Sequence, residues 1–167
     1  MTEEYQKNNE VRSRLVSHIS VKRSRSGAQD GEQLMTGRAA CSCGKLQLVC
    51  EGEPVRISMC HCLECQWRTG AVFGNQAWFS RQQITSISGL AAEFKRVADS
   101  GNSVTFRFCP VCGSTVYWEA EGFPGLIAVA VGSFADPAFP APAHSVCERR
   151  RHHWVKSAFG MPVEHSN

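Results

Sequence analysis

The stretch Cys60-His61-Cys62-Leu63-Glu64-Cys65 places three cysteines within six residues. Two shorter clusters flank it, Cys41-Ser42-Cys43 and Cys109-Pro110-Val111-Cys112, so that seven of the nine cysteines lie in clusters. A disulfide inside C-x-C would strain the preferred bond geometry, whereas two thiolates at this spacing can bind the same metal. Soft sulfur ligands select zinc, copper(I) or iron–sulfur clusters, and zinc is the usual structural metal. The clusters therefore predict zinc sites, with a disulfide framework as the alternative.

Length and charge place this cysteine pattern in context. The chain has 167 residues, enough for one domain with its own core. It has no apolar run of membrane-spanning length, and its start, Met1–Lys7, is polar rather than signal-like. Clustered cysteines without a secretion signal predict a metal-binding protein of a reducing compartment, the cytoplasm. Seven thiolates and two Zn²⁺ would bring the formal charge of +3 to about zero, which argues against a nucleic-acid partner.

The chain divides near residue 35. Residues 1–34 are polar and charged with few large apolar side chains, so we expect a disordered N-terminal extension. Residues 35–160 are expected to form the zinc-binding domain, and residues 161–167 a short tail.

The pattern from Met35 onward predicts a mainly β fold. One expected strand, Ser103–Phe108, alternates cleanly and should have one solvated face, whereas Leu126–Val131 is continuously apolar and should be central. A short helix is expected within Cys62–Thr69, and the proline-rich Asp136–Pro142 should be an extended loop. The other expected strands are Val55–Met59, Ala71–Phe79, Phe94–Val97 and Thr115–Trp118.

Spacing alone allows two ways of grouping the cysteines. Gly44 and Gly113 follow the second cysteine of their clusters, where a tight zinc knuckle favours a positive φ. Two such knuckles would make a closed site of four thiolates, leaving the Cys60 cluster as three thiolates with an open position, the pattern of a reactive zinc. The alternative pairs two C-x-x-C motifs and leaves the remaining cysteines as a loose second set. The four cysteines of that pairing are Cys62, Cys65, Cys109 and Cys112.

The ordered clusters, with Arg68-Thr69-Gly70 and Val131–Pro137, resemble the glutathione-dependent formaldehyde-activating enzyme family, which includes the centromere protein V type domains. The resemblance runs from about Met35 to Trp154. It implies a β-rich fold of the Mss4-like kind and a carbon–sulfur lyase that condenses formaldehyde with glutathione to S-hydroxymethylglutathione. It also implies two zinc ions. The structural zinc would be held by Cys41, Cys43, Cys109 and Cys112, and the second by Cys60, Cys62 and Cys65.

The chemistry of a three-thiolate zinc agrees with this activity. Three thiolates leave the site with a net charge of −1 and make the zinc a weak Lewis acid toward water. A soft external thiol is a better fourth ligand, and its thiolate would attack an aldehyde carbonyl. We therefore predict Cys60, Cys62 and Cys65 as the catalytic set, although a fourth protein ligand would make this zinc structural.

Neighbouring side chains have candidate roles. His61 is expected to make a hydrogen bond behind the metal rather than to bind it, and Glu64 to be an exposed carboxylate or a proton carrier. Arg68 is predicted to bind a carboxylate of glutathione, with Arg56 as a second flanking cation. Cys147 is a spare thiol unless the fold brings it to the second zinc. Aromatic side chains that could wall a pocket, or belong to the core, are Trp67, Phe73, Trp78 and Phe79.

The sequence thus predicts an enzyme acting on a small thiol and an aldehyde, with no nucleic-acid or membrane partner and an unspecified oligomeric state. A non-catalytic, zinc-stabilised binding module is the first alternative. A thiol-redox or metal-handling protein is the second.

Overall fold

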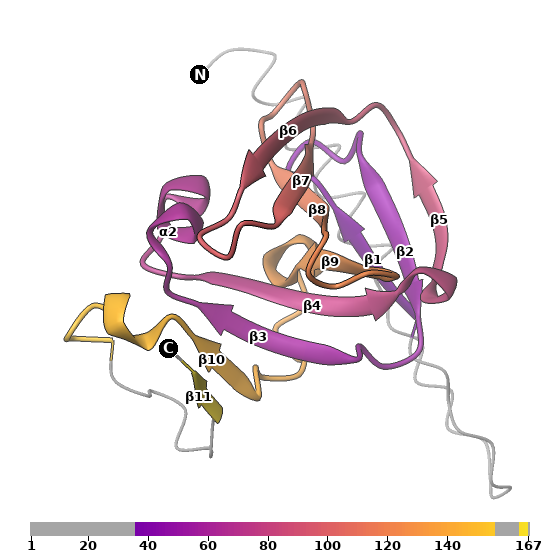
Figure 1. Ribbon diagram of the computed structural model, residues 1–167. Coiled ribbons are helices and arrows are strands. Elements are labelled where there is room, and N and C mark those ends of the chain that lie inside the picture. The colour runs from indigo at the N-terminus through magenta and orange to yellow at the C-terminus, as the bar shows by residue number, and fades with distance from the viewer. Residues whose placement is uncertain (1–35, 156–163, 167) are drawn as a thin grey trace, which may run out of the picture.

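Two β-sheets form most of the computed structural model, which describes residues 36–155 and 164–166 (Figure 1). The predicted extension 1–34 lies outside these residues. The smaller sheet has the order β1-β2-β5 and the larger the order β11-β10-β3-β4-β9-β8-β7-β6. The strands are β1 (Thr36–Ala40), β2 (Gln47–Glu51), β3 (Arg56–Cys60), β4 (Gly74–Ser80), β5 (Ile84–Ser88), β6 (Ala92–Val97), β7 (Ser103–Phe108), β8 (Thr115–Ala120), β9 (Leu126–Ala130), β10 (His144–Val146) and β11 (Glu164–Ser166). The mainly β prediction is confirmed.

Helix is scarce in the described residues, as expected. The α-helix α2 (Leu63–Thr69) falls inside the predicted range and stops at Gly70, which takes the left-handed conformation with φ 64°. Three short 3-10 helices complete the elements: η1 (Arg81–Gln83), η2 (Val131–Phe134) and η3 (Glu148–Arg150). No helix in the described part of the chain is long and apolar enough to cross a membrane.

The alternation of side chains along the central strands produces two apolar clusters. Along β4, Ala77 and Phe79 face a large core shared with β1 and β2, whereas Trp78 faces a second cluster. Strand β9 repeats this arrangement, with Ile127 and Val129 in the first cluster and Ala128 in the second. Since successive side chains of a strand point to opposite faces, the larger sheet is covered on both sides here. The expectation that the Leu126 strand is central is therefore confirmed.

Strand β7 matches the predicted range and alternates as expected, with Val104 and Phe106 buried and Ser103, Thr105 and Arg107 half-buried. The proline-rich segment 136–142 contains no helix or strand. It leads the chain into β10, which pairs in parallel with β3, while the other described pairs apart from β10–β11 are antiparallel. Figure 1 shows β10 and β11 beside β3, on the side of the molecule near α2.

Several strands were missed from the sequence. Strands β1, β2, β5, β10 and β11 have three to five residues each. Runs this short carry little periodic signal, and pairing with distant strands decides their conformation. Part of the predicted tail, Glu164–Ser166, belongs to β11 and pairs with β10, whereas the rest of residues 156–167 lies outside the described part.

Candidate metal centres

The first cluster joins two knuckles that are far apart in sequence. Its ligand atoms all lie within 4.8 Å of one another, and they come from the turn between β1 and β2 and from the turn between β7 and β8. The members are Cys41, Cys43, Cys109 and Cys112. The structure therefore shows the first of the two groupings and not the pairing of two C-x-x-C motifs.

Each knuckle is closed by a backbone hydrogen bond from its glycine to its first cysteine, three residues back in one and four in the other. The amide of Gly44 donates to the carbonyl of Cys41 at 2.9 Å, and the amide of Gly113 donates to that of Cys109 at 2.8 Å. Both glycines have positive φ, 74° and 73°, a conformation that costs glycine little because it has no Cβ. The positive φ predicted at both positions is confirmed. The Ser42 amide also donates to the Ser114 hydroxyl at 3.2 Å, which ties one knuckle to the other.

The spacing of the sulfurs suits a tetrahedral metal. Sγ of Cys43 lies 3.6 Å from Sγ of Cys41 and 3.6 Å from Sγ of Cys109. A tetrahedral zinc with Zn–S bonds of 2.3 Å would separate its sulfurs by about 3.8 Å. All nine cysteines are free thiols, so the clusters are not disulfide pairs. The donor set fits zinc by number, type and spacing.

The second cluster lies where β3 ends and α2 begins. Cys60 is the last residue of β3, and Cys62 is the N-cap of α2, accepting a hydrogen bond from the Cys65 amide at 3.4 Å. The three sulfurs lie within 4.8 Å of one another, with Cys60 buried and the other two half-buried. No further His, Cys, Asp or Glu of the described residues completes this group.

The three thiols share protons unequally. Hydrogen bonds from the Cys60 and Cys65 side chains lower the pKa of Cys62 to about 2, against the opposing effect of burial. The pKa of Cys60 is raised by its hydrogen bonds with Cys62 and Cys65 and by burial. For Cys65, a hydrogen bond with Cys60 lowers the pKa, but Cys62 and burial outweigh it and raise it overall. One thiolate with two thiols is thus the stable charge state of the cluster at neutral pH.

Two arginines surround this thiolate. Arg96 on β6 lowers the pKa of Cys62, and Arg68 on α2 lowers that of Cys65, both through their positive charge. Both guanidinium groups lie against the Phe106 ring, at 5.7 and 5.3 Å from its centroid, and Arg68 lies 4.5 Å from that of Trp118. The aromatic face of the second apolar cluster therefore holds the cations beside the thiols. Sequence reasoning missed Arg96, because only folding brings β6 to this helix.

His61 does not belong to the group of clustered sulfurs. It is fully buried, its Nε2 lies 3.2 Å from the Ser145 hydroxyl, and its ring packs edge-on against Phe73 at 5.8 Å. Burial lowers the pKa of His61, so the ring is neutral. Ser145 in turn donates to Glu148. This hydrogen-bonded set connects the loop between two thiols to β10 and η3.

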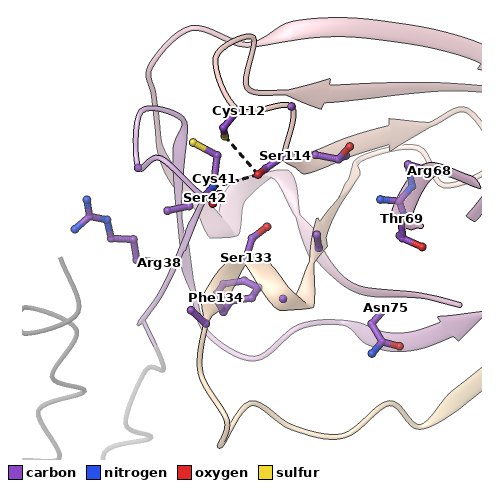
Figure 2. Close-up of a pocket in the computed structure, with 17 residues that line it drawn as sticks. Arg38, Cys41, Ser42, Arg68, Thr69, Asn75, Cys112, Ser114, Ser133 and Phe134 are labelled. Atoms are coloured by element: carbon purple, nitrogen blue, oxygen red, sulfur yellow. Dashed lines mark hydrogen bonds between the residues drawn. The ribbon is translucent and has the colours of Figure 1, made fainter. Parts of the chain in front are cut away.

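A cavity of about 690 Å³ is bordered by residues of the first cluster and by helix α2 (Figure 2). Arg68 and Thr69 of α2 line one side, Cys41, Ser42 and Cys112 line the opposite side, and Ser133 and Phe134 of η2 lie between them. The thiols of the second cluster do not line this cavity. Arg68 nevertheless lies close to both the cavity and the second cluster. A Cβ atom placed on Gly74 would lie 2.9 Å from Nη2 of Arg68 and 3.5 Å from Sγ of Cys65.

Several predicted neighbours take other places. Arg56 sits at the opposite end of β3 from Cys60, about 13 Å away along an extended strand, so it does not flank the cluster. Glu64 forms an ion pair with Arg96 at 3.5 Å. The four aromatics do not line the cavity: Trp78 and Phe79 are core residues, Phe73 packs on His61, and Trp67 is 72% exposed.

The two remaining cysteines differ sharply. Cys50 is buried in the core of the smaller sheet, as its alternation with Leu46 and Leu48 suggested. Cys147 interacts through its side chain with Cys60, so the fold does bring this thiol to the second cluster. Spacing in the sequence could not show it, because the contact depends on the pairing of β10 with β3.

Comparison with known proteins gives one strong match. A family model described as glutathione-dependent formaldehyde-activating enzyme matches residues 36–157, which include both cysteine clusters. A search of curated proteins finds no match. Among solved structures, the crystal structure of a Rhodobacter sphaeroides protein from structural genomics is similar, at 16% identity and a TM-score of 0.46, covering 57% of this chain and 85% of that one.

Proposed function

Since the chain belongs to the glutathione-dependent formaldehyde-activating enzyme family, we propose that it is a zinc-dependent carbon–sulfur lyase of a reducing compartment, the cytoplasm. Its substrates are a small thiol, with glutathione as the first candidate, and formaldehyde or a related aldehyde. Cys60, Cys62 and Cys65 hold the zinc that takes part in the reaction. A second zinc on the four-thiol cluster stabilises the fold, which makes two ions per chain.

The proposal depends on the difference in ligand number between the clusters. Four sulfurs complete a tetrahedral zinc, whereas three leave one position for another ligand. The second cluster brings three thiols together within 4.8 Å and adds no fourth member from the described residues. An external thiol is the ligand that suits the remaining position of a sulfur-bound metal.

The chemistry follows from the protonation of that thiol. Bound zinc would lower the pKa of the substrate thiol and keep it as the nucleophilic thiolate near neutral pH. The sulfur then forms a bond with the aldehyde carbon, and the carbonyl oxygen takes up the proton that the thiol lost. No redox partner is required, because the product is the sum of the two substrates. The reaction rate should therefore rise with pH and then level off.

Arg68 is the residue that we assign to glutathione binding. Its guanidinium lies near Cys65 and also lines the cavity, so it can pair with a carboxylate of a thiol whose sulfur is at the cluster. Nε of Arg68 and Oδ1 of Asn75 are buried without hydrogen-bond partners among the described residues. Both side chains line the cavity, and an unpaired buried polar atom costs about 1–3 kcal/mol, which a polar ligand or water would offset.

A non-catalytic binding module remains the second candidate, because the thiols of the second cluster do not line the cavity. Zinc-loaded protein mixed with glutathione and formaldehyde decides between the two, with thiohemiacetal formation followed by NMR exchange spectroscopy. We expect faster formation with the wild type, loss of the acceleration with Cys62→Ala, and no loss with Cys50→Ala as the matched control. A wild type that accelerates the reaction of neither glutathione, cysteine nor other small thiols would leave the binding module as the better assignment.

A further inference from the structure

Strand β10 fixes a further cysteine beside the second cluster. It pairs in parallel with β3, with Val146 opposite Cys60, and the His61 amide donates to the Val146 carbonyl at 3.0 Å. Cys147 is the next residue of the chain. The backbone hydrogen bonds that end β3 therefore also determine the position of Cys147 relative to Cys60.

The turn after Cys147 is anchored to the helix that carries the cluster. The Arg150 amide donates to the Cys147 carbonyl at 3.0 Å, and Gln66 of α2 donates to the Arg150 carbonyl at 3.2 Å. The Arg150 side chain pairs with Asp99, in the turn between β6 and β7, at 2.9 Å. Cys147 is thus held between β3 and α2, the two elements that supply the three clustered thiols.

The side chain of Cys147 reaches the cluster. Cys147 follows Val146, the residue opposite Cys60 in the sheet, and the pKa of its thiol is raised by burial and the charge of Cys62 and lowered by Cys60. The Cys147 sulfur does not lie within 4.8 Å of all three others, so a full four-sulfur set requires this half-buried side chain to move. Among the described residues, Cys147 is the one cysteine outside the second cluster that lies beside it.

Cations lie beside the cluster, whereas burial and the charge of Cys62 raise the pKa of the Cys147 thiol in the metal-free protein. Four thiolates and Zn²⁺ carry a net charge of −2, which is stable in a partly buried site only beside cations. Arg68 acts on Cys65, Arg96 acts on Cys62 while paired with Glu64, and Arg150 acts on Cys147 while paired with Asp99.

We propose that Cys147 is a fourth, exchangeable zinc ligand of the Cys60 cluster, which it closes while no substrate is bound. The exchange rests on the proposed function, whereas the ligand assignment does not. When a substrate thiol arrives, its sulfur replaces that of Cys147, and Cys147 leaves as a thiol with the proton of the incoming group. The charge of the site is unchanged, so the exchange requires no further acid or base.

Cadmium-113 NMR of the full chain, with cadmium in both sites, tests the ligand set. We expect two resonances at shifts typical of four sulfur ligands. Cys147→Ser should move one of them to the range of three sulfurs and one oxygen, while Cys50→Ala leaves both in place. Two unchanged four-sulfur resonances in Cys147→Ser, or a wild type that already shows one three-sulfur site, would overturn the assignment.

Alkylation of wild-type protein provides a second measurement that does not depend on a variant folding. With both zinc ions bound, iodoacetamide should modify the Cys147 peptide at least about tenfold more slowly than in protein from which mild chelation has removed only the second ion, because a metal-bound thiolate is protected. Equal rates in these two forms would contradict the proposal. Glutathione should restore fast modification. If Cys147 is protected but neither glutathione nor cysteine nor another small thiol releases it, the ligand assignment stands and the proposed function is contradicted.

Discussion

The two cysteine clusters hold similar ligands but are built in different ways. The first lies between two turns, each with a glycine of positive φ, and it joins residues 66 positions apart in sequence at a distance of 3.6 Å. The second lies within six residues of one segment, where a strand gives way to a helix. The first can therefore hold distant parts of the fold together, whereas the second is already local and needs no metal to close a long loop.

The two clusters also differ in the groups that stabilise their thiolates. In the first cluster, burial alone would raise the pKa of Cys112, but hydrogen bonds with Ser114 lower it to about 6, so backbone and hydroxyl groups stabilise the thiolate. In the second, two arginines on aromatic rings supply positive charge. Cations that border a cavity can also attract an anionic substrate. We infer from the comparison that an exchangeable ligand and the surrounding charge, rather than cysteine content, would distinguish a reactive metal site from a stabilising one.

The largest expected effect is the loss of the first cluster. Cys112 is exposed, so its replacement by serine removes almost no packing, and any large loss of stability must come from the metal. We expect Cys112→Ser to unfold the domain or lower its melting temperature strongly, because structural zinc contributes on the order of 10 kcal/mol to folding.

The matched variant is Cys65→Ser in the second cluster. It should stay folded, with a small change in melting temperature by circular dichroism and a zinc content near one per chain. Equal destabilisation by both variants would contradict the division into a stabilising and a reactive site.

Mild chelation should separate the two sites in the unmodified protein. Elemental analysis should give about two zinc ions per chain, falling toward one, because a site with an exchangeable ligand loses its metal before a closed one. Cys147→Ser should lose the second ion faster still. Simultaneous loss of both ions would show that the clusters do not differ in lability.

Much of this contrast could be predicted from the sequence, because it depends on local patterns. The knuckles were predicted by two cysteines followed by Gly44 or Gly113, and α2 by the residues after Cys62. Strand β7 was predicted by alternation and β9 by a continuous apolar run. Each of these features needs only the nearest neighbours in the chain to be recognised.

The remainder depends on contacts between distant segments. Arg96 looks like any exposed arginine of an edge strand until β6 pairs with β7 and brings it to Phe106. Cys147 follows a three-residue strand with no periodic signal, and its place beside Cys60 is set by the parallel pairing of β10 with β3. The prediction that Arg56 flanks the cluster was wrong because four residues of extended strand separate it from Cys60 by about 13 Å.

The pH dependence of metal binding should reveal the shared thiolate. The lowered pKa of Cys62 keeps it ionised at neutral pH, while the raised values of Cys60 and Cys65 keep them protonated. Metal binding to these three should release about two protons, so affinity should rise about 100-fold per pH unit near pH 7. Competition with a chromophoric chelator measures this slope, in Cys147→Ser to exclude the fourth thiol. A release of three protons would show that Cys62 is not a thiolate in the metal-free protein.

A smaller effect is expected at the arginine between cluster and cavity. Arg68→Ala should weaken glutathione binding about tenfold or more, because this is the usual contribution of a charge-assisted hydrogen bond to affinity. Calorimetry on zinc-loaded protein measures the change. Arg56→Ala is the control, since that side chain is at the far end of β3. Arg68→Lys should recover part of the affinity if charge matters, and none if only packing on Trp118 does.

The smallest expected effect tests how closely the second cluster and the cavity are joined. A Cβ at Gly74 would lie 2.9 Å from Nη2 of Arg68 and 3.3 Å from Cβ of Cys65, and only the first of these atoms is the end of a flexible side chain. Gly74→Ala should therefore displace the guanidinium, lower glutathione affinity by about threefold and leave zinc content unchanged. Gly122→Ala is a suitable control, because its new methyl group would meet only the amide end of Asn102 in an exposed turn. If Gly74→Ala instead loses zinc and keeps its glutathione affinity, the new methyl group has displaced Cys65 rather than Arg68. The absence of a side chain at Gly74 would then be required for metal binding.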